Sequence, residues 1–455
     1  MDFNQFLERH RGKKTAVCGV GVSNLPLIRL LRGAGMEVEA RDKKDLSVLG
    51  DAGRELERLG VGLISGEHYL DDIDADFIYR SPGIRPDVPG FVRAIGRGAV
   101  LTSEMEAFFE VCPARIIAIT GSEGKTTTST VIAEMLKAEG KRVFLGGNIG
   151  TPLLDRVPDM TSDDYVVVEL SSFQLMTMKR SAPMAVVTNV TPNHLDIHRG
   201  MDEYIAAKAN VFVHQSGENC VVLNADNDIT RSFADIAKGE VRWFSLEEKV
   251  ENGAYFDGEW LVSVENGAER RIVRADEIKV PGMHNVANYL TAICAVRGIV
   301  GDKAIAKVAR EFGGVEHRIE FVREVDGVRY YNDSIASSPT RTIAGLKSFK
   351  QKVVLIAGGY DKHIPFEPLA VELPAHVKTL VLCGATADKI ESAARAVEGC
   401  PPIVRADGFE QAVIAARDIA SEGDIVLMSP ACASFDQFKN FAERGEKFKN
   451  IVWEF

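Results

Sequence analysis

A short glycine-bearing turn between an apolar run and a helical run is the first feature of this sequence that could do chemistry. The segment ARIIAITGSEGKTTTSTVIAEML reads as a strand, a turn and a helix, and the turn closes with Gly-Lys-Thr. Such turns place backbone N–H groups around phosphate oxygens at a helix N-terminus. There Lys125 would reach the β- and γ-phosphates, and the hydroxyl of Thr126 would bind Mg²⁺. The predicted ATP-binding turn consists of Gly121, Ser122, Glu123, Gly124, Lys125, Thr126 and Thr127.

The turn is shorter than the usual phosphate loop, which reads G-x-x-x-x-G-K-[ST]. Here Gly121 stands only three positions before Gly124. An ordinary strand-helix turn that happens to contain Gly-Lys-Thr is the alternative interpretation, and the strand and helix on either side favour phosphate binding.

Candidate metal ligands follow two further apolar runs. DYVVVEL ends its apolar stretch at Glu169, and AVVTNVTPNHLDIHRG carries His194, Asp196 and His198. Because the carboxyl ends of parallel strands share one edge of a sheet, these side chains are expected beside the phosphate turn. Carboxylate oxygens suit Mg²⁺, and histidine can bind a divalent ion. A solvated glutamate and ordinary loop histidines remain the alternatives.

Composition limits the class of protein. The 455 residues are 45% hydrophobic and 26% charged, which is ordinary for a soluble globular chain. The net charge is −11, without a basic block, so nucleic acid and anionic membranes are not expected as partners. The seven cysteines form no C-x-x-C pair, which fits a reducing cytoplasm. Neither a signal peptide nor a membrane span is expected.

Strand-like runs alternate with helical patterns along the whole chain, which predicts an α/β fold with parallel sheets covered by helices. Three strand-turn-helix starts divide it into predicted domains of residues 1–106, 107–314 and 315–455. Only residues 241–267 show strand-like alternation, and they are predicted to form a small antiparallel excursion inside the second domain.

Several motifs, in this order and spacing, resemble the Mur ligase family. They are GSEGKTTT, GGNIGTP, ELSSFQL, NVTPNHLD, YIAAKANVF, HNVAN, HRIE and YNDS. The resemblance covers essentially the whole chain, and the short phosphate turn is this family's form. It implies a Rossmann-like N-terminal domain that binds a UDP-linked substrate, a central domain of the P-loop ATPase type, and a Rossmann-like C-terminal domain that binds an amino acid.

Within the family, the run SPACASFDQFKNFAERG is similar to members that add D-glutamate to UDP-N-acetylmuramoyl-L-alanine. The resemblance implies an ATP-dependent amide ligase that forms an acyl phosphate, with two Mg²⁺ ions, in cytoplasmic synthesis of the peptidoglycan precursor. Its expected partners are small-molecule substrates, and a monomer is expected. Another amide ligase of the superfamily, such as an L-alanine-adding enzyme or folylpolyglutamate synthase, is one alternative. A non-catalytic nucleotide-sensing protein is another.

The resemblance also implies roles for residues of the central region and beyond. Lys125, His194 and Lys208 are the expected catalytic residues. Lys208 aligns with a lysine that CO₂ carbamylates in many members, and a carbamate would turn its ammonium into an oxygen ligand. The expected metal ligands are Thr126, Glu169, His194 and carbamylated Lys208, and the further ATP contacts are Asn285, Asn288, Arg318 and Asp333.

The remaining implied contacts belong to the other two substrates. GVGVSNL only partly matches the dinucleotide fingerprint, since Asn24 replaces its third glycine, which argues against an NAD-dependent dehydrogenase. The resemblance places the UDP-substrate there instead. Its expected contacts are Gly21, Val22, Ser23, Asn24, Asp42, Lys43, Ser81, Gly83, Asn148, Ser171 and Gln174. Those of D-glutamate are Lys362, Ser434, Phe435 and Phe441.

One position departs from the family pattern. Ile335 follows Asn-Asp-Ser where many relatives have lysine, so a positive charge is missing there. Lys362 or Lys347 is expected to replace it.

Overall fold

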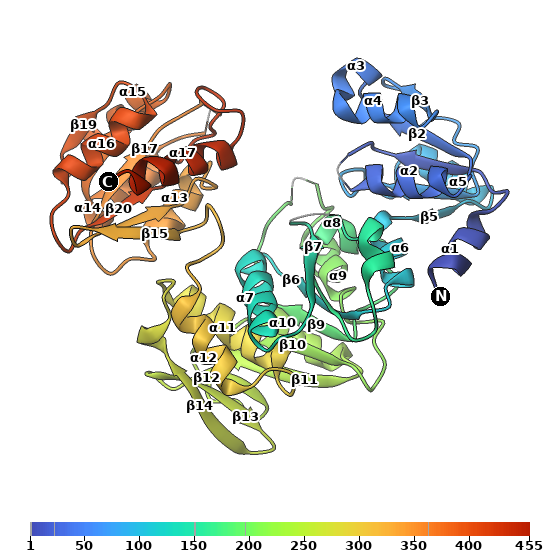
Figure 1. Ribbon diagram of the computed structural model, residues 1–455, viewed down its shortest axis with the longest axis horizontal. Helices are drawn as coiled ribbons and strands as arrows, with labels where there is room; N and C mark the ends of the chain where they lie inside the picture. Colours follow the sequence, from blue (N-terminus) through green and yellow to red (C-terminus); the bar gives the residue numbers. More distant parts are fainter. Residues whose placement is uncertain (1, 22, 150–151, 196, 363) are drawn as a thin grey trace. The chain divides into compact units, whose positions relative to one another are not determined.

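The computed structural model describes residues 2–21, 23–149, 152–195, 197–362 and 364–455 (Figure 1). The chain forms two compact units. The first unit consists of Met1–Val273 with Ala287–Val308, and the second consists of Arg274–Val286 with Ala309–Phe455. No helix among these described residues is both long and apolar enough to cross a membrane.

A five-stranded sheet lies at the start of the first unit, in the order β3-β2-β1-β4-β5. Neighbouring strands of this sheet pair parallel. Because β1 is flanked by β2 and β4, the chain reverses its direction of winding there, and the ends of β1 and β4 form the edge where ligands collect. The strands are β1 (Thr15–Cys18), β2 (Val38–Asp42), β3 (Gly62–Ser65), β4 (Phe77–Arg80) and β5 (Val100–Thr102). The helices are α1 (Phe3–His10), α2 (Asn24–Gly33), α3 (Leu46–Leu49), α4 (Asp51–Arg58) and α5 (Pro89–Gly96).

A nine-stranded sheet completes the first unit, in the order β14-β13-β12-β11-β10-β9-β6-β8-β7. Strand β6 pairs parallel with both β8 and β9, and β8 is buried along its whole length. The strands are β6 (Arg115–Thr120), β7 (Val143–Gly147), β8 (Tyr165–Glu169), β9 (Met184–Val187), β10 (Cys220–Asn224), β11 (Glu240–Ser245), β12 (Gly253–Phe256), β13 (Trp260–Glu265) and β14 (Ala268–Arg274). The α-helices are α6 (Glu104–Val111), α7 (Lys125–Ala138), α8 (Ser172–Leu175), α9 (Met201–Ala209), α10 (Asp228–Ser232), α11 (Met283–Val296) and α12 (Asp302–Glu311), and the 3-10 helices are η1 (Leu154–Asp159) and η2 (Phe233–Ile236). The start of α11, the end of α12 and the 3-10 helix η3 (Ala275–Glu277) group with the second unit.

The expected antiparallel excursion is only partly present. Strands β12 and β13 pair antiparallel, but β11 pairs parallel with both β10 and β12. The prediction was therefore wrong for β11, and the segment extends the large sheet instead of standing apart from it. Alternation of apolar and polar residues reports one solvated face, whatever the direction of the neighbouring strand.

The second unit is built on a six-stranded sheet in the order β15-β16-β20-β17-β18-β19. Its first two strands form an antiparallel pair, and the other pairings are parallel. Side chains of the central strand β17 alternate between two cores, since Leu355 packs in one and Ile356 in the other. The strands are β15 (Glu320–Val325), β16 (Val328–Asn332), β17 (Val353–Ala357), β18 (Val377–Leu382), β19 (Ile403–Arg405) and β20 (Ile425–Met428). The helices are α13 (Pro339–Leu346), α14 (Glu367–His376), α15 (Ala387–Arg395), α16 (Phe409–Ile419) and α17 (Phe441–Trp453).

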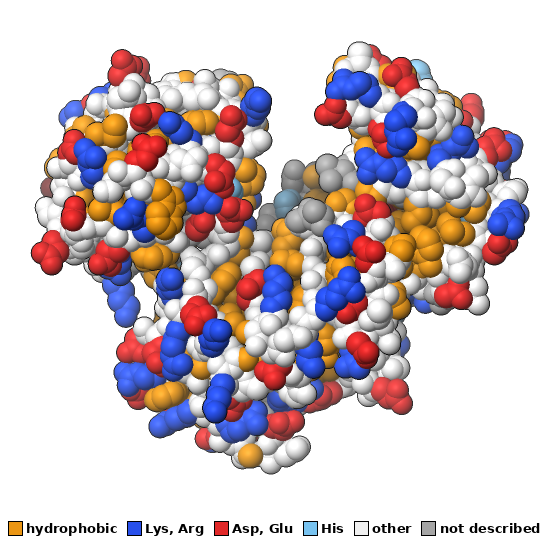
Figure 2. Space-filling model, in the orientation of Figure 1, with side chains coloured by type: hydrophobic (Ala, Val, Ile, Leu, Met, Phe, Trp, Pro, Cys, Tyr) orange, Lys and Arg blue, Asp and Glu red, His pale blue; other side chains and the backbone are white. Residues whose placement is uncertain are grey.

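These sheets confirm the α/β class with mostly parallel strands. Each sheet falls within one of the ranges 1–106, 107–314 and 315–455, but the contacts group the first two sheets in one unit, so the three domain boundaries stay a prediction. All seven cysteines are free thiols. On the face drawn in Figure 2, side chains of both charges are intermixed.

Candidate active site

The phosphate turn lies where it was predicted, between β6 and α7. Both of its glycines have positive φ, +149° at Gly121 and +78° at Gly124. A Cβ atom on Gly121 would lie 1.9 Å from Oγ1 of Thr188, and one on Gly124 would lie 2.6 Å from Oδ1 of Asn288. Backbone conformation and close packing thus both require glycine, and they leave the turn's amides at the start of a 14-residue helix.

Two lysines converge on one backbone carbonyl of this turn. Nζ of Lys125 donates to the carbonyl oxygens of Gly121 and Ser122 at 2.9 Å, and Nζ of Lys208 donates to that of Gly121 at 2.7 Å. Lys208 is 2% exposed and lies over the ring of Tyr204 at 4.6 Å. Burial, reinforced by the charge of Lys125, lowers the pKa of Lys208 to about 6, although Glu169 opposes the shift. Lys208 is therefore mostly an uncharged amine at neutral pH.

Glu169 is the last residue of β8 and is 1% exposed. Its carboxylate accepts hydrogen bonds from Oγ1 of Thr126 at 2.8 Å and from Nδ2 of Asn148 at 2.9 Å. A buried carboxylate beside a threonine hydroxyl offers the oxygen ligands that Mg²⁺ prefers. The donor set therefore fits the predicted magnesium site.

The strand order β9-β6-β8 confirms that three strand ends meet at the edge of the phosphate turn. His194 lies on the loop after β9, is exposed, has a φ of +55°, and faces the ring of Phe173 edge-on at 5.2 Å. Its role as a metal ligand stays a prediction. Asp196 lies outside the described residues.

His198 has a packing role that the sequence did not suggest. It is 3% exposed and stacks on Phe173 with ring centroids 5.1 Å apart. Nε2 lies 2.9 Å from Oγ of Ser172, and Nδ1 lies 3.2 Å from Oε1 of Glu203. Burial lowers the pKa of His198. This ring therefore joins its loop to α8 and α9.

The two asparagines of HNVAN have different surroundings. Oδ1 of Asn288 accepts a hydrogen bond from Oγ1 of Thr128 at 3.2 Å, within the first turn of α7. Nδ2 of Asn285 donates to the carbonyl of Pro281 at 2.7 Å, and this residue groups with the second unit. Asn288 thus lies beside the phosphate turn, and the contact of either asparagine with ATP stays a prediction.

In the turn after β1, side chains that were expected to contact the UDP-substrate hydrogen-bond mainly to the backbone of the turn and its neighbours. Asp42 accepts hydrogen bonds from the backbone N–H groups of Val20 at 2.7 Å and Lys44 at 2.9 Å. Asn24 is 2% exposed, its Nδ2 donates to the carbonyl of Gly19, and its backbone N–H donates to that of Gly21. The N–H of Asn24 is therefore used within the turn. Among the other expected contacts there, Gly21 and Lys43 are exposed, Ser23 is half-buried, and Val22 lies outside the described residues.

The turn after β4 packs on the turn after β1. The N–H of Ser81 donates to the carbonyl of Cys18 at 2.8 Å, and a Cβ atom on Gly19 would lie 2.6 Å from Cβ of Ser81. Gly83 is exposed in the same turn. The two predicted UDP-substrate turns thus lie together at the point where the winding of the sheet reverses.

Ser171 and Gln174 form the capping box of α8. The N–H of Gln174 donates to Oγ of Ser171 at 3.3 Å, and Oε1 of Gln174 accepts from the N–H of Ser171 at 2.9 Å. These contacts fix the start of the helix that follows Glu169. Binding of substrate by either residue stays a prediction.

In the second unit, the HRIE and YNDS motifs meet. Asp333 follows β16, is 4% exposed, and accepts hydrogen bonds from Oγ of Ser429 at 2.7 Å and the N–H of Ile319 at 3.3 Å. Burial raises the pKa of Asp333 to about 7, against the opposing effects of Ser429 and Arg318. His317 and Ile319 have φ values of +62° and +45°. Such backbone strain in non-glycine residues is concentrated at functional sites.

The two lysines expected to compensate for Ile335 have different partners. Nζ of Lys362 lies 3.4 Å from Oγ of Ser337, whereas Nζ of Lys347 pairs with Glu372 at 2.6 Å. Lys362 thus contacts Ser337, two residues along the chain from Ile335, and compensation by either lysine stays a prediction.

The other expected D-glutamate contacts lie around SPACAS. Ser434 is 2% exposed. Phe435 faces Tyr360 edge-on at 5.8 Å, and Phe441 faces His317 edge-on at 6.0 Å. Both phenylalanines are exposed, which leaves their rings available to a ligand.

Arg444 of α17 is a residue that sequence reasoning missed. It is 2% exposed, and burial lowers its pKa to about 10. Its guanidinium donates to Oγ of Ser334 at 3.0 Å and to the carbonyls of Cys432 and Ala433 at 3.1 Å. It thereby joins the loop after β16 to the loop after β20. The sequence signal for this role was a single arginine in FAERG, the end of the run SPACASFDQFKNFAERG.

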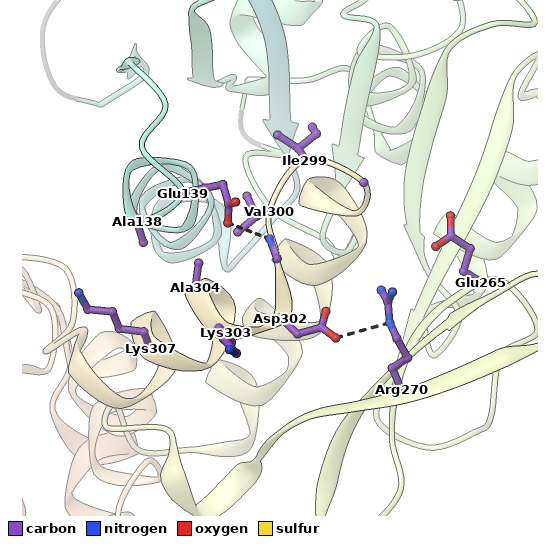
Figure 3. A pocket seen from close by; sticks show the side chains of 12 residues that line it. Ala138, Glu139, Glu265, Arg270, Ile299, Val300, Asp302, Lys303, Ala304 and Lys307 are labelled. Carbon is purple, nitrogen blue, oxygen red and sulfur yellow. Dashed lines mark hydrogen bonds and ion pairs between the residues drawn. The ribbon is translucent and has the colours of Figure 1, made fainter.

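A hollow of about 780 Å³ lies away from these residues (Figure 3). It includes Glu139, whose carboxylate accepts from the N–H of Gly301 at 2.9 Å, and an ion pair between Arg270 and Asp302 at 3.6 Å. It lies at the C-terminal end of α7, about 20 Å along the helix from the phosphate turn. The hollow is therefore no part of the candidate active site.

The chain is similar to known proteins over nearly its whole length. Residues 119–296 match the model of the Mur ligase middle domain, and residues 317–432 match that of the Mur ligase glutamate ligase domain. The chain is 52% identical over 455 residues to the UDP-N-acetylmuramoylalanine–D-glutamate ligase of Clostridium novyi, covering 99% of this chain and 98% of the relative. It is 51% identical to the ligase of the same name from Acetivibrio thermocellus, with the same coverage.

Among solved structures, the fold is similar to that of UDP-N-acetylmuramate-alanine ligase from Thermotoga maritima, with a TM-score of 0.58 and 17% identity. That match covers 97% of this chain and 99% of the other. A pseudomurein peptide ligase type C from Methanothermus fervidus has a TM-score of 0.55 at 18% identity, covering 97% and 100%. At these identities the likeness shows the fold alone.

Proposed function

Because this chain belongs to the Mur ligase family, we propose that it is an ATP-dependent ligase that joins D-glutamate to UDP-N-acetylmuramoyl-L-alanine. The free carboxylate of the UDP-substrate attacks the γ-phosphorus of ATP, which gives an acyl phosphate and ADP. The amine of D-glutamate then attacks the acyl carbon, and the tetrahedral intermediate loses phosphate and a proton to give the amide. The observation that carries this proposal is the convergence of Lys125, Lys208 and Glu169 on the phosphate turn.

Electrostatic repulsion is the obstacle in the first step, because a carboxylate must approach a polyphosphate. Backbone amides from Gly121 to Thr127 would bind the phosphates, and Lys125 would exchange its carbonyl partners for phosphate oxygens. Thr126 and Glu169 would hold Mg²⁺, which supplies positive charge to the phosphates. The protein's contribution is then mainly positioning and charge stabilisation.

Lys208 supports a second metal position. Its amine is mostly uncharged at neutral pH, so the nitrogen lone pair is available to attack CO₂. Loss of a proton from the adduct leaves a carbamate, whose two oxygens are the kind of ligand that Mg²⁺ prefers. With the carbamate and His194, this edge would hold the second Mg²⁺.

The other two substrates are assigned to the remaining turns. The turns after β1 and β4, with Asn148, Ser171 and Gln174, would bind the UDP-substrate. Lys362, Ser434, Phe435 and Phe441 would bind D-glutamate, whose side-chain carboxylate requires a cation. Asn285, Asn288, Arg318 and Asp333 would contact ATP. The chain is proposed to act as a cytoplasmic monomer with domains of residues 1–106, 107–314 and 315–455.

Phosphate release from ATP tests the proposal, with UDP-N-acetylmuramoyl-L-alanine present and either D- or L-glutamate added. We expect release only when the UDP-substrate and D-glutamate are both present. Release with UDP-N-acetylmuramate and L-alanine instead would favour the alanine-adding alternative. ATP binding without any turnover would favour a nucleotide sensor.

A further inference from the structure

Two arginines flank the turn formed by residues 81–84. Arg80 is the last residue of β4, and Arg85 follows the turn directly. Neither was assigned a role from the sequence. Together they are called the arginine pair. Each contacts a different helix beside the nine-stranded sheet, within the same compact unit.

Arg80 joins this turn to α8. Its Nη1 donates to the carbonyl of Ile84 at 2.9 Å, at the end of the turn. Its Nη2 donates to the carbonyl of Phe173 at 2.7 Å and to Oγ1 of Thr177 at 3.2 Å. Helix α8 begins three residues after Glu169, so one guanidinium contacts both the turn and the helix that follows the candidate magnesium ligand.

The charge of Arg80 is deeply buried. The side chain is 1% exposed, and burial lowers its pKa to about 10, with Glu106 opposing the shift. Oγ1 of Thr177 also donates to Oε2 of Glu106 at 3.4 Å, which links the guanidinium to this carboxylate. A buried charge is tolerated only where fixed hydrogen-bonding partners replace water. The junction is therefore a defined arrangement and not an adaptable surface contact.

Arg85 makes the corresponding connection to α9. Its two terminal nitrogens each lie 3.0 Å from one oxygen of Glu203, in a bidentate pair, and Nη1 also donates to the carbonyl of Ile197 at 2.7 Å. Helix α9 carries Lys208, and Ile197 belongs to the loop that carries His194. The planar fork of arginine fixes both distance and angle in such a pair, which lysine cannot do.

We propose that Arg80 and Arg85 are positioning residues that fix the turn of residues 81–84 relative to two elements of the metal site: α8, which follows Glu169, and α9, which carries Lys208. Arg80 fixes the position of the turn relative to α8, which follows Glu169. Arg85 fixes its position relative to α9, which carries Lys208. The reacting carboxylate is thereby presented to the γ-phosphate, while the contacts that bind each nucleotide are made by other residues. This inference rests on the proposed function.

Arg80→Lys and Arg85→Lys test it, because each keeps the charge and removes the fork. We expect kcat to fall on the order of 100-fold, since small misplacements of reacting groups have effects of this size. The dissociation constants for ATP and for UDP-N-acetylmuramoyl-L-alanine, measured by calorimetry, should stay within about twofold of wild type. Arg29→Lys is the matched control, because Arg29 pairs with Glu55 at 2.9 Å inside the first sheet's layer.

A kcat within about twofold of the Arg29→Lys control would overturn the inference. So would a loss of affinity for the UDP-substrate as large as the loss in kcat, since the pair would then only shape a binding surface. If Arg80→Lys does not fold, Thr177→Val removes the hydroxyl partner of Arg80 and keeps the guanidinium, and it should lower kcat in the same selective way. Absence of turnover in the wild-type protein would sink the proposed function itself, so the two failures are distinguishable.

Discussion

Both compact units bury an ionisable group beside their candidate site, but with opposite chemistry. In the first unit the group is a base, Lys208, whose pKa falls to about 6. In the second it is an acid, Asp333, whose pKa rises to about 7. Burial favours the uncharged form in both cases. The first unit thereby gains a neutral amine near its phosphate turn, and the second gains a carboxyl that is partly protonated at neutral pH.

The units also build their sites differently. The first places its residues at the ends of the adjacent strands β9, β6 and β8, so the sheet itself brings them together. The second relies on Arg444, which joins loops roughly a hundred residues apart in the chain through the carbonyls of Cys432, Ala433 and Ser334. A site positioned by a sheet edge should tolerate loss of one side chain structurally, whereas a site joined by one guanidinium should not.

Of the substitutions that test this difference between the units, Lys125→Ala should lower turnover the most. Loss of a cation that faces transferring phosphate should lower turnover on the order of 10³-fold, and calorimetric binding of the UDP-substrate should not change. Lys137→Ala is the matched control, because Lys137 lies on the same helix and pairs with Glu134 at 2.8 Å on the surface. Turnover of Lys125→Ala equal to that control would refute the assignment of the phosphate turn.

Lys208→Ala should have the next largest effect and reduce turnover about 100-fold. Short carboxylic acids such as acetate should restore part of the activity, because their oxygens can replace those of the carbamate. Phosphate release, titrated with acetate and with a chloride control, measures the rescue. Full activity without any added acid would remove Lys208 from the metal site.

Arg444→Lys should affect the second unit alone. We expect the KM for D-glutamate to rise about tenfold, because lysine cannot make the four hydrogen bonds of the guanidinium. The dissociation constant for UDP-N-acetylmuramoyl-L-alanine should be unchanged. Lys447→Arg is the control, because Lys447 lies on the same helix as Arg444 and pairs on the surface with Glu410 of α16. Equal KM values in the two variants would contradict a role for Arg444 in joining the loops.

The pH dependence of stability should show the smallest effect, with opposite signs in the two units. Between about pH 6 and 10.5, unfolded Lys208 binds a proton that the folded form lacks, so its contribution to the free energy of unfolding rises with pH. Between pH 3.8 and about 7, folded Asp333 binds a proton that the unfolded form lacks, so its contribution falls as pH rises.

Urea unfolding of Lys208→Met and Asp333→Asn in CO₂-free buffers measures both terms. Each substitution should flatten the pH dependence only within its own window. A wild-type slope in both variants would show that neither burial shift is present.

The sequence predicted what depends on local pattern. Apolar runs bounded by Gly-Lys-Thr or Glu169 located strand ends, and parallel strands share an edge, so the phosphate turn and its neighbours could be inferred. Long-range hydrogen bonds to backbone carbonyls leave no periodicity, so Arg80 and Arg444 were missed. The parallel pairing of β11 with β12 was not predicted for a similar reason, because the pattern of buried residues is the same for both strand directions.

The free thiols have a practical consequence. Burial raises the pKa of Cys18, Cys220, Cys294 and Cys383 to about 12, and that of Cys112 and Cys432 to about 11. Thiolate is the form that alkylating dyes attack, so at neutral pH these six should react slowly. If half-buried Cys400 were replaced by serine, the remaining cysteines would react with such dyes only slowly. One cysteine introduced at a chosen surface position would then carry a fluorophore almost alone, which makes the chain well suited to single-molecule spectroscopy.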